Sequence, residues 1–319
     1  MMAVLTEPAA VRVAGTRHLL SSDDLDRATV ERLLERAASF EAVSEREVKK
    51  VPALRGRTVL SVFFEPSTRT ASSFELAAKR LSADTISLKS SGSSVEKGET
   101  LKDTLLTLDA YGPDVVVIRH AQIGAAALAT RYTRAAVVNA GDGAHQHPTQ
   151  SLLDLYTMRA ALGRVEGLHV AIVGDVLHSR VARSNLALLL ACGARVTLVG
   201  PPSLIPRGIE ATGASVSHDI ADIAAADVVY VLRMQRERML PGEAYVPSLR
   251  EYTLRYGVTS QRLRSGQVVM HPGPMNRGVE ISDEVADSAA SLITRQVKAG
   301  LVVRMAVLYD LLAEREVTA

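Results

Sequence analysis

The segment Phe63-Phe64-Glu65-Pro66-Ser67-Thr68-Arg69-Thr70 joins a strand pattern to a helix pattern. The apolar run from Val59 to Phe64 is typical of a short buried strand, and apolar residues recur at helical spacing over 72–81. Hydroxyls, backbone N–H groups and a guanidinium therefore crowd the start of a helix, where unpaired donors and partial positive charge suit a phosphate. Arg69 would add a planar charge that binds the same anion through two hydrogen bonds. An ordinary Ser/Thr N-cap beside a solvated arginine is the alternative.

The same alternation of strands and helices runs along the whole chain. Strand patterns occupy residues 59–64, 85–88, 115–118, 136–138, 170–173, 196–199, 228–232 and 268–270. Helix patterns lie between most of them, at residues 72–81, 101–110, 124–131, 149–161, 185–192 and 219–225. This order predicts βαβ units and mostly parallel sheets, which places the chain in the α/β class.

The length of 319 residues suits two domains of about 150 residues each. We expect two doubly wound domains, at 1–148 and 149–291, each with a mostly parallel sheet of four strands flanked by helices. Interdomain helices join them, the first running over 149–162 and stopping at Gly163. A C-terminal helix over about 292–319, broken by Gly300, should pack back on the first domain. Since doubly wound sheets bind ligands at the carboxyl ends of their strands, we expect a site between the domains.

Composition and charge exclude several classes of function. The net charge of +2, the absence of Trp and the lack of RNP-like motifs argue against nucleic-acid binding. The single cysteine, Cys192, excludes an intramolecular disulfide, and its apolar helical surroundings are typical of a small buried hydrophobe. Residues 1–13 lack a signal-peptide core, and no apolar run approaches the roughly 20 residues that span a bilayer. We therefore expect a soluble, cytoplasmic protein that binds neither nucleic acid nor membranes.

Three segments before residue 151 carry polar groups suited to anions or carbonyls. Ser93 and Lys97 lie in a Gly/Ser-rich loop, where a lysine can swing onto an anion, although a solvated surface loop is the alternative. Arg119 directly follows a buried strand pattern, at the ligand edge of a parallel sheet. In the segment 139–150, zinc binding by His145 and His147 is one interpretation, but no third clustered ligand accompanies them. A neutral His147 that donates to a carbonyl oxygen, with Gln150 one turn on, fits better.

Three segments in the second half point to carboxylate and amide recognition. Arg180 follows the strand pattern at 170–173, in a turn that lacks the G-x-G-x-x-G spacing of dinucleotide folds. Arg233 follows the strand pattern at 228–232, so two arginines could hold a molecule with two carboxylates, plain charged loops being the alternative. The turn His271-Pro-Gly-Pro274 is rigid and has carbonyl groups that can accept from an amide or amine. A purely structural turn is the alternative there.

Together these segments resemble the aspartate/ornithine carbamoyltransferase family, over about His18 to Leu312. S-T-R-T is shared by both branches of that family, whereas H-P-T-Q, G-D-x-x-H-S-R-V-A-R-S, R-x-Q-x-E-R and H-P-G-P are typical of the aspartate branch. Ornithine enzymes usually carry a cysteine in an H-C-L-P turn, where this chain has His271-Pro272. The family commonly has Arg after S-T-R-T, whereas this chain has Ala71.

The resemblance implies an enzyme that transfers the carbamoyl group of carbamoyl phosphate to the α-amine of L-aspartate, an early committed step of pyrimidine synthesis, without metal or organic cofactor. The residues it implies for binding carbamoyl phosphate are Ser67, Thr68, Arg69, Thr70, Ser93, Lys97, Arg119, His147, Gln150, Pro272 and Gly273. Those it implies for catalysis are Arg69, Thr70, Lys97, Arg119 and His147. Those it implies for aspartate are Lys97, Arg180, Arg233 and Gln235.

The resemblance also implies a homotrimer with shared active sites, in which Ser93 and Lys97 reach into the neighbouring subunit. Regulatory chains or a dihydroorotase are the candidate partners. One alternative is a carbamoyltransferase for another amino acid, which would need a cation-accepting pocket in place of Arg180 and Arg233. Another is a non-catalytic scaffold paralogue. A dehydrogenase of the Rossmann type fails because the glycine fingerprint is missing.

Overall fold

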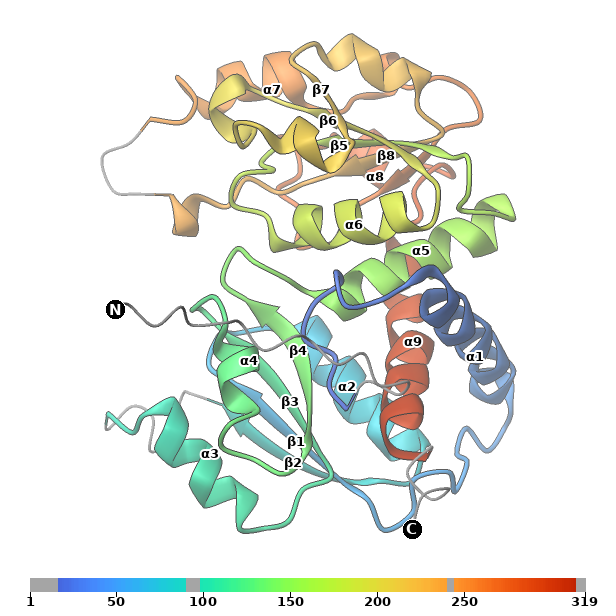
Figure 1. Cartoon of the computed structure of the whole chain (residues 1–319). Coiled ribbons are helices and arrows are strands. Elements are labelled where there is room, and N and C mark those ends of the chain that lie inside the picture. The colour runs from blue at the N-terminus through green and yellow to red at the C-terminus, as the bar shows by residue number, and fades with distance from the viewer. Residues whose placement is uncertain (1–16, 90–97, 240–243, 314–319) are drawn as a thin grey trace, which may run out of the picture.

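The computed structural model describes residues 17–89, 98–239 and 244–313, which fold around two separate sheets (Figure 1). The first sheet has the order β2-β1-β3-β4, with β1 at Thr58–Phe63, β2 at Asp84–Lys89, β3 at Val115–His120 and β4 at Ala136–Asp142. The second has the order β7-β6-β5-β8-β9, with β5 at His169–Val173, β6 at Arg195–Val199, β7 at Ser215–Ser217, β8 at Val228–Val231 and β9 at Val268–Met270. All neighbouring strands are parallel, so the expected architecture of two α/β units is confirmed.

Helices cover both sheets and join them. Those of the first unit are α1 (Arg27–Glu45), α2 (Thr68–Arg80), α3 (Leu101–Asp109) and α4 (Ala125–Ala129). The later ones are α5 (Pro148–Leu162), α6 (Arg180–Ala191), α7 (Leu249–Tyr256), α8 (Asp283–Ala286) and α9 (Ile293–Ala313). Within the described ranges, every helix is too short or too polar to cross a membrane.

The strands β1, β3 and β4 of the first sheet are largely buried on both faces, whereas the edge strand β2 is partly exposed. Alternate side chains of β1 enter different cores: Val59 and Phe63 pack with α1, α2 and α9, whereas Leu60 and Val62 pack on the other face toward α3 and α4. A strand covered on both faces reads as a nearly continuous apolar run, and this explains the pattern that precedes Glu65.

The winding of each sheet sets the place of the ligand site. In the first sheet the chain runs from β1 to β2 at one edge and then crosses back to place β3 on the other side of β1. In the second sheet it runs from β5 through β6 to β7 and then crosses back to place β8 on the other side of β5. Loops at the carboxyl ends of two such neighbouring strands diverge and leave a crevice. Arg119 lies at the end of β3, and the segments that follow β1, β5 and β8 carry Arg69, Arg180 and Arg233.

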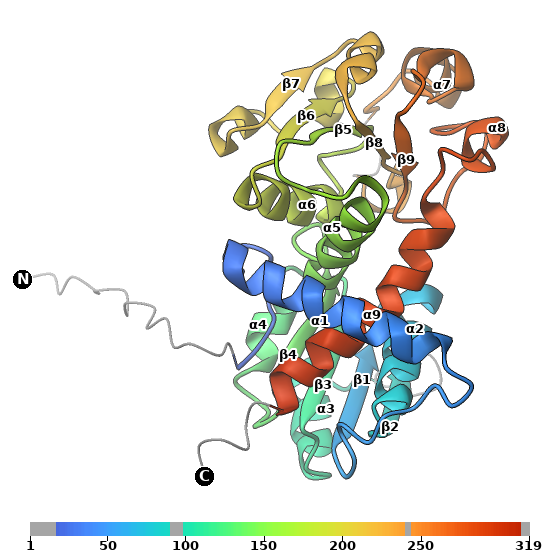
Figure 2. The ribbon, with the colours of Figure 1, turned by 90° about the vertical axis from the view of Figure 1, so that its right-hand side faces the viewer.

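Two helices connect the units. Helix α5 crosses from β4 toward the second sheet and ends at Gly163, whose left-handed backbone (φ 79°) confirms the predicted stop. Helix α9 returns from the second unit and packs against α1, α2 and α5 (Figure 2). The C-terminal helix therefore does lie against elements of the first half of the chain.

The structure corrects three expectations. The second sheet has five strands rather than four, because the short and polar β7 adds to its edge. Residues 220–225 form a 3-10 helix rather than an α-helix. Helix α9 runs through Gly300 without a break, and the guanidinium of Arg304 occupies the space beside this glycine: a Cβ there would lie 2.7 Å from Arg304 Nη1.

Candidate active site

One cavity of about 480 Å³ lies between the two units, at the carboxyl ends of both sheets. All the predicted site residues within the described ranges line it, namely Ser67, Thr68, Arg69, Thr70, Arg119, His147, Gln150, Arg180, Arg233, Gln235, Pro272 and Gly273. The remaining two, Ser93 and Lys97, lie outside the described residues. Segments from six distant parts of the sequence therefore meet at one place.

The start of α2 forms one end of the cavity. Ser67 is its N-cap, with extended backbone, and its side chain makes no capping hydrogen bond. The first N–H groups of the helix thus keep the unpaired donors that attract an anion. Arg69 forms no ion pair with any described residue, and partial burial lowers the pKa of its guanidinium. This end of the cavity presents positive charge that no described carboxylate neutralises.

The turn His271–Pro274 closes over Arg69. Gly273 has a left-handed backbone (φ 64°), and a Cβ at this position would lie 2.6 Å from Arg69 Nη2. A glycine is required here on both counts, since other residues avoid this conformation and their side chains would displace the guanidinium.

Arg119 and His147 form the next part of the cavity. Arg119 extends from the end of β3 and donates to the carbonyl of Ala140 at 3.2 Å. Burial and the nearby charge of Arg180 lower the pKa of Arg119 to about 9. Burial, with the charge of Arg119 next, holds the pKa of His147 well below its ordinary value. His147 is therefore a neutral imidazole, and its Nδ1 has no hydrogen-bond partner among the described residues.

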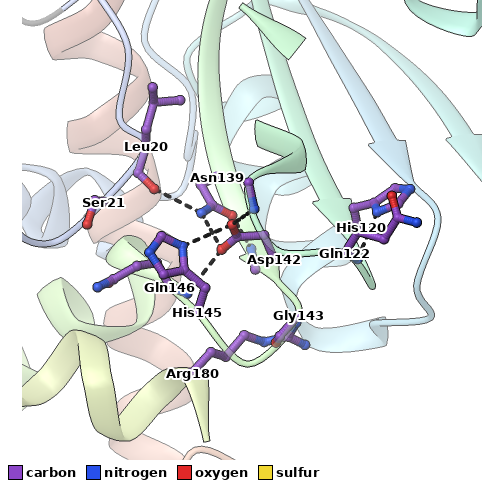
Figure 3. A network of polar contacts seen from close by, with 12 residues as sticks. Leu20, Ser21, His120, Gln122, Asn139, Asp142, Gly143, His145, Gln146 and Arg180 are labelled. Atoms are coloured by element: carbon purple, nitrogen blue, oxygen red, sulfur yellow. Dashed lines mark hydrogen bonds and ion pairs between the residues drawn. The ribbon is translucent and has the colours of Figure 1, made fainter. Parts of the chain in front are cut away.

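The loop that carries His147 is fixed by the buried carboxylate of Asp142 (Figure 3). Asp142 Oδ1 accepts from Asn139 Nδ2 at 2.8 Å and from the backbone N–H of Gln146 at 3.0 Å. The N–H of His147 donates to Ser184 Oγ of α6 at 2.8 Å. The loop is thus held from both units before α5 begins.

The zinc interpretation finds no support in this loop. His145 Nδ1 lies 3.1 Å from Asp142 Oδ2, so this histidine belongs to the Asp142 network in Figure 3. Within the described ranges no group of three His, Cys, Asp or Glu side chains could hold a metal ion.

The arginines from the second unit are already paired with carboxylates. Arg180, the first residue of α6, donates from Nη1 and Nη2 to the two oxygens of Glu65 at 2.9 and 3.2 Å. Its Nη1 also donates to the carbonyl of Gly143 at 3.0 Å. Arg233 pairs with Glu237 and donates to Gln235.

Glu65 and Arg238 are residues that sequence reasoning left without a role. Glu65 joins the units, since it also lies 3.2 Å from Arg238 and 3.4 Å from Arg119. Burial acts to raise the pKa of the Glu65 carboxyl, yet the hydrogen bond from Arg180 and the charges of all three arginines outweigh it and lower that pKa. Nothing in the sequence distinguished these two residues from ordinary surface charges. Glu65 stands next to Pro66, and Arg238 is one of three arginines in residues 233–238.

Arg304 is a third residue that sequence reasoning left out. It lines the cavity from α9 and is only 4% exposed. Its Nη1 donates to Ser73 Oγ of α2 at 2.7 Å, and burial lowers its pKa to about 10. It adds a buried cation behind the start of α2.

Comparisons with known proteins agree with this geometry. Residues 17–160 match the family model described as "Aspartate/ornithine carbamoyltransferase, carbamoyl-P binding domain". Residues 166–311 match "Aspartate/ornithine carbamoyltransferase, Asp/Orn binding domain". The two models together cover most of the chain.

Similar proteins include the aspartate carbamoyltransferase catalytic subunit of Salinispora arenicola, which is 59% identical over 93% of this chain and 98% of the relative. That of Thermobifida fusca is 57% identical over 93% and 95%. A solved aspartate transcarbamoylase of Trypanosoma cruzi, in complex with carbamoyl phosphate and aspartate, superposes with a TM-score of 0.83 at 32% identity, over 92% of this chain and 96% of that one. The chain belongs to the aspartate/ornithine carbamoyltransferase family.

Proposed function

We propose that this protein transfers the carbamoyl group of carbamoyl phosphate to the α-amine of L-aspartate, giving N-carbamoyl-L-aspartate and phosphate in pyrimidine synthesis. The observation that carries the proposal is the cavity itself, which joins an uncapped helix start and Arg69 to a cluster of arginines from the other unit. A phosphate and a dicarboxylic amino acid match these two ends. The names of the curated relatives point to the same reaction.

The phosphate end holds the leaving group. Ser67, Thr68, Arg69 and Thr70 bind the phosphate through hydroxyls, the N–H groups at the start of α2 and the guanidinium. Bidentate contact with Arg69 fixes the orientation of carbamoyl phosphate. The mixed anhydride is already an activated acyl donor, and positioning supplies much of the acceleration.

Arg119, His147 and Thr70 act on the carbamoyl carbonyl. The neutral imidazole and the guanidinium donate to the carbonyl oxygen and stabilise the negative charge that develops there. Gln150 and the carbonyl groups of Pro272 and Gly273 accept from the carbamoyl NH₂. These contacts orient the carbon toward the amine.

Arg180, Arg233 and Gln235 orient aspartate, with Lys97 beside them. The neutral α-amine attacks the carbamoyl carbon, a C–N bond forms, and the C–O bond to phosphate breaks. The amine loses one proton in this step, and the departing phosphate can take it.

The two ends of the cavity belong to two domains, at 1–148 and 149–291, and the helix from about 292 returns to the first.

The active unit is a homotrimer in which Ser93 and Lys97 serve the neighbouring subunit. Cyclic symmetry can place one subunit's loop beside the next subunit's site. This part of the proposal rests on the family resemblance, since both residues lie outside the described ranges.

The substrate is tested by offering L-aspartate and L-ornithine separately with carbamoyl phosphate. We expect N-carbamoyl-aspartate at a rate far above that of citrulline, because the second unit lines the cavity with arginines, which repel the δ-ammonium of ornithine. Faster formation of citrulline would refute the proposed substrate.

The shared site is tested by mixing two inactive variants, Arg69→Ala and Lys97→Ala, under conditions that let subunits exchange. Sharing predicts that activity returns, because some sites receive both intact residues. Background activity in mixtures with proven exchange would show that Lys97 serves its own subunit.

A further inference from the structure

We propose that Asp154 is a positioning residue that sets the site's selectivity for the carbamoyl NH₂, by fixing the amide of Gln150 and the turn His271–Pro274 at once. The proposal rests on the function proposed above and names a residue that does not itself touch the substrate. It concerns which phosphate compounds the site accepts.

Asp154 lies on α5 one turn after Gln150 and is fully buried. Its Oδ1 accepts from Gln150 Nε2 at 3.0 Å and from Gln296 Nε2 of α9 at 2.8 Å. Its Oδ2 accepts from Asn185 Nδ2 of α6 at 2.9 Å and from the hydroxyl of Tyr230 of β8 at 2.6 Å. One carboxylate thus ties together four elements, with one oxygen anchored in the second unit and the other directed to two glutamines.

A carboxylate can only accept hydrogen bonds, so it decides which way each amide faces. Gln150 must turn its NH₂ toward Asp154, and its Oε1 is then the atom left for the cavity that Gln150 lines. An oxygen at that position accepts an N–H from the substrate's amide. The reversed amide would place the NH₂ of Gln150 against the NH₂ of the substrate, and its oxygen against Asp154 Oδ1.

The second glutamine carries the same constraint to the turn. Because Gln296 gives its NH₂ to Asp154, its oxygen is free to accept from the backbone N–H of His271, at 2.9 Å. His271 Nδ1 in turn accepts from the N–H of Gly273 at 2.8 Å, which holds the turn that contains Pro272. Asp154 Oδ1 is therefore linked to Gln150 by one hydrogen bond and to the turn His271–Pro274 by two, through Gln296. The carbonyl groups of that turn are the other proposed acceptors for the carbamoyl NH₂.

The four donors around Asp154 match a carboxylate, which can only accept hydrogen bonds. Burial raises the pKa of its carboxyl to about 6, and the four hydrogen bonds act in the opposite direction. At neutral pH the group is a carboxylate and keeps all four donors.

Acetyl phosphate separates this role from general damage, because a methyl group replaces the NH₂ of carbamoyl phosphate. We measure the dissociation constants of carbamoyl phosphate, acetyl phosphate and inorganic phosphate by calorimetry. Asp154→Ala should weaken carbamoyl phosphate by about tenfold or more, the scale of a lost hydrogen bond with an unpaired buried donor. Acetyl phosphate and inorganic phosphate should change by less than about twofold, since Arg69 and α2 hold their phosphate groups.

Asp154→Asn should restore most of the selectivity. Its new NH₂ can face Tyr230, whose hydroxyl can accept, and Asn185, whose Oδ1 has no partner among the described residues. The remaining oxygen then still faces the glutamines. Thr157→Val is the matched control, because it removes a buried hydroxyl from the same helix outside this network and should leave all three constants unchanged.

Equal weakening of all three ligands in Asp154→Ala, or equal losses in the Asn and Ala variants, would overturn the proposal. If Asp154→Ala does not fold, Gln296→Met tests the connection to the turn and should also weaken carbamoyl phosphate selectively; an unselective loss would count against it. A wild type that binds carbamoyl phosphate but carbamoylates no amino acid would contradict the proposed function and leave this comparison of ligands intact.

Discussion

The two ends of the cavity differ in whether their arginines are paired with carboxylates. At the start of α2, Arg69 has no carboxylate partner within the described ranges, and the N-cap side chain of Ser67 makes no capping bond. Across the cavity, Arg180 and Arg238 share Glu65, and Arg233 pairs with Glu237. The phosphate end is a preformed cationic site, whereas the other end holds its cations in internal ion pairs.

The cavity therefore receives its two anionic substrates in different ways. Backbone N–H groups and a lone guanidinium are ready for a phosphate without rearrangement, which lowers the cost of binding. Across the cavity, Glu65 of the β1–α2 loop holds Arg180 and Arg238 of the opposite unit. We expect this link to couple the approach of the two units to the position of the arginines that we propose for the second substrate.

The largest effect is expected at the centre of the cavity, between the two ends. His147→Ala should lower kcat by roughly 10²–10³, the scale for one donor to a developing oxyanion. The dissociation constant of carbamoyl phosphate should rise by less than about tenfold, because Arg69 and the N–H groups of α2 hold the phosphate. Steady-state kinetics and calorimetry separate the two quantities.

Treatment of the wild type with EDTA is the control for the same residue and should leave kcat unchanged. Loss of activity on chelation that zinc restores would assign His147 to a metal site. If His147→Ala weakened carbamoyl phosphate binding by the same factor as it lowered kcat, His147 would have to be assigned to substrate binding rather than to the oxyanion.

The sequence predicted most of the strands well because the central strands, such as β1, β3, β5 and β8, are buried on both faces and read as apolar runs. It failed at β7, where three partly polar residues form an edge strand that packing and not pattern defines. It failed at Gly300 for a different reason. Glycine usually weakens a helix, but here the space of its side chain holds the guanidinium of Arg304, a contact that only the fold creates.

Candidate site residues could be predicted from the sequence where a single segment places a polar side chain close after a strand pattern. Arg119 and Arg233 follow strand patterns directly, Arg69 and Arg180 follow within a short turn, and the switch points of the two sheets bring such positions together. Contacts between distant segments were not predictable. Glu65 is 115 residues from Arg180 and 173 from Arg238, and no local pattern announces a pair at that separation.

A smaller effect, on the aspartate end alone, is expected from Glu65→Gln. The neutral amide loses the ion pairs that join the units, and Arg119, Arg180 and Arg238 are left to repel one another. We expect aspartate and its unreactive analogue succinate to bind about tenfold more weakly, the scale of a charge-assisted hydrogen bond. Glu237→Gln, whose carboxylate is half exposed beside Arg233, is the matched variant and should have a smaller effect.

Calorimetric titration of Glu65→Gln with inorganic phosphate, and then with succinate in the presence of phosphate, tests the contrast between the two ends most directly. We expect the dissociation constant of phosphate to stay within about twofold of the wild type, while that of succinate rises about tenfold. Equal changes in both constants, or tighter succinate binding, would contradict this expectation.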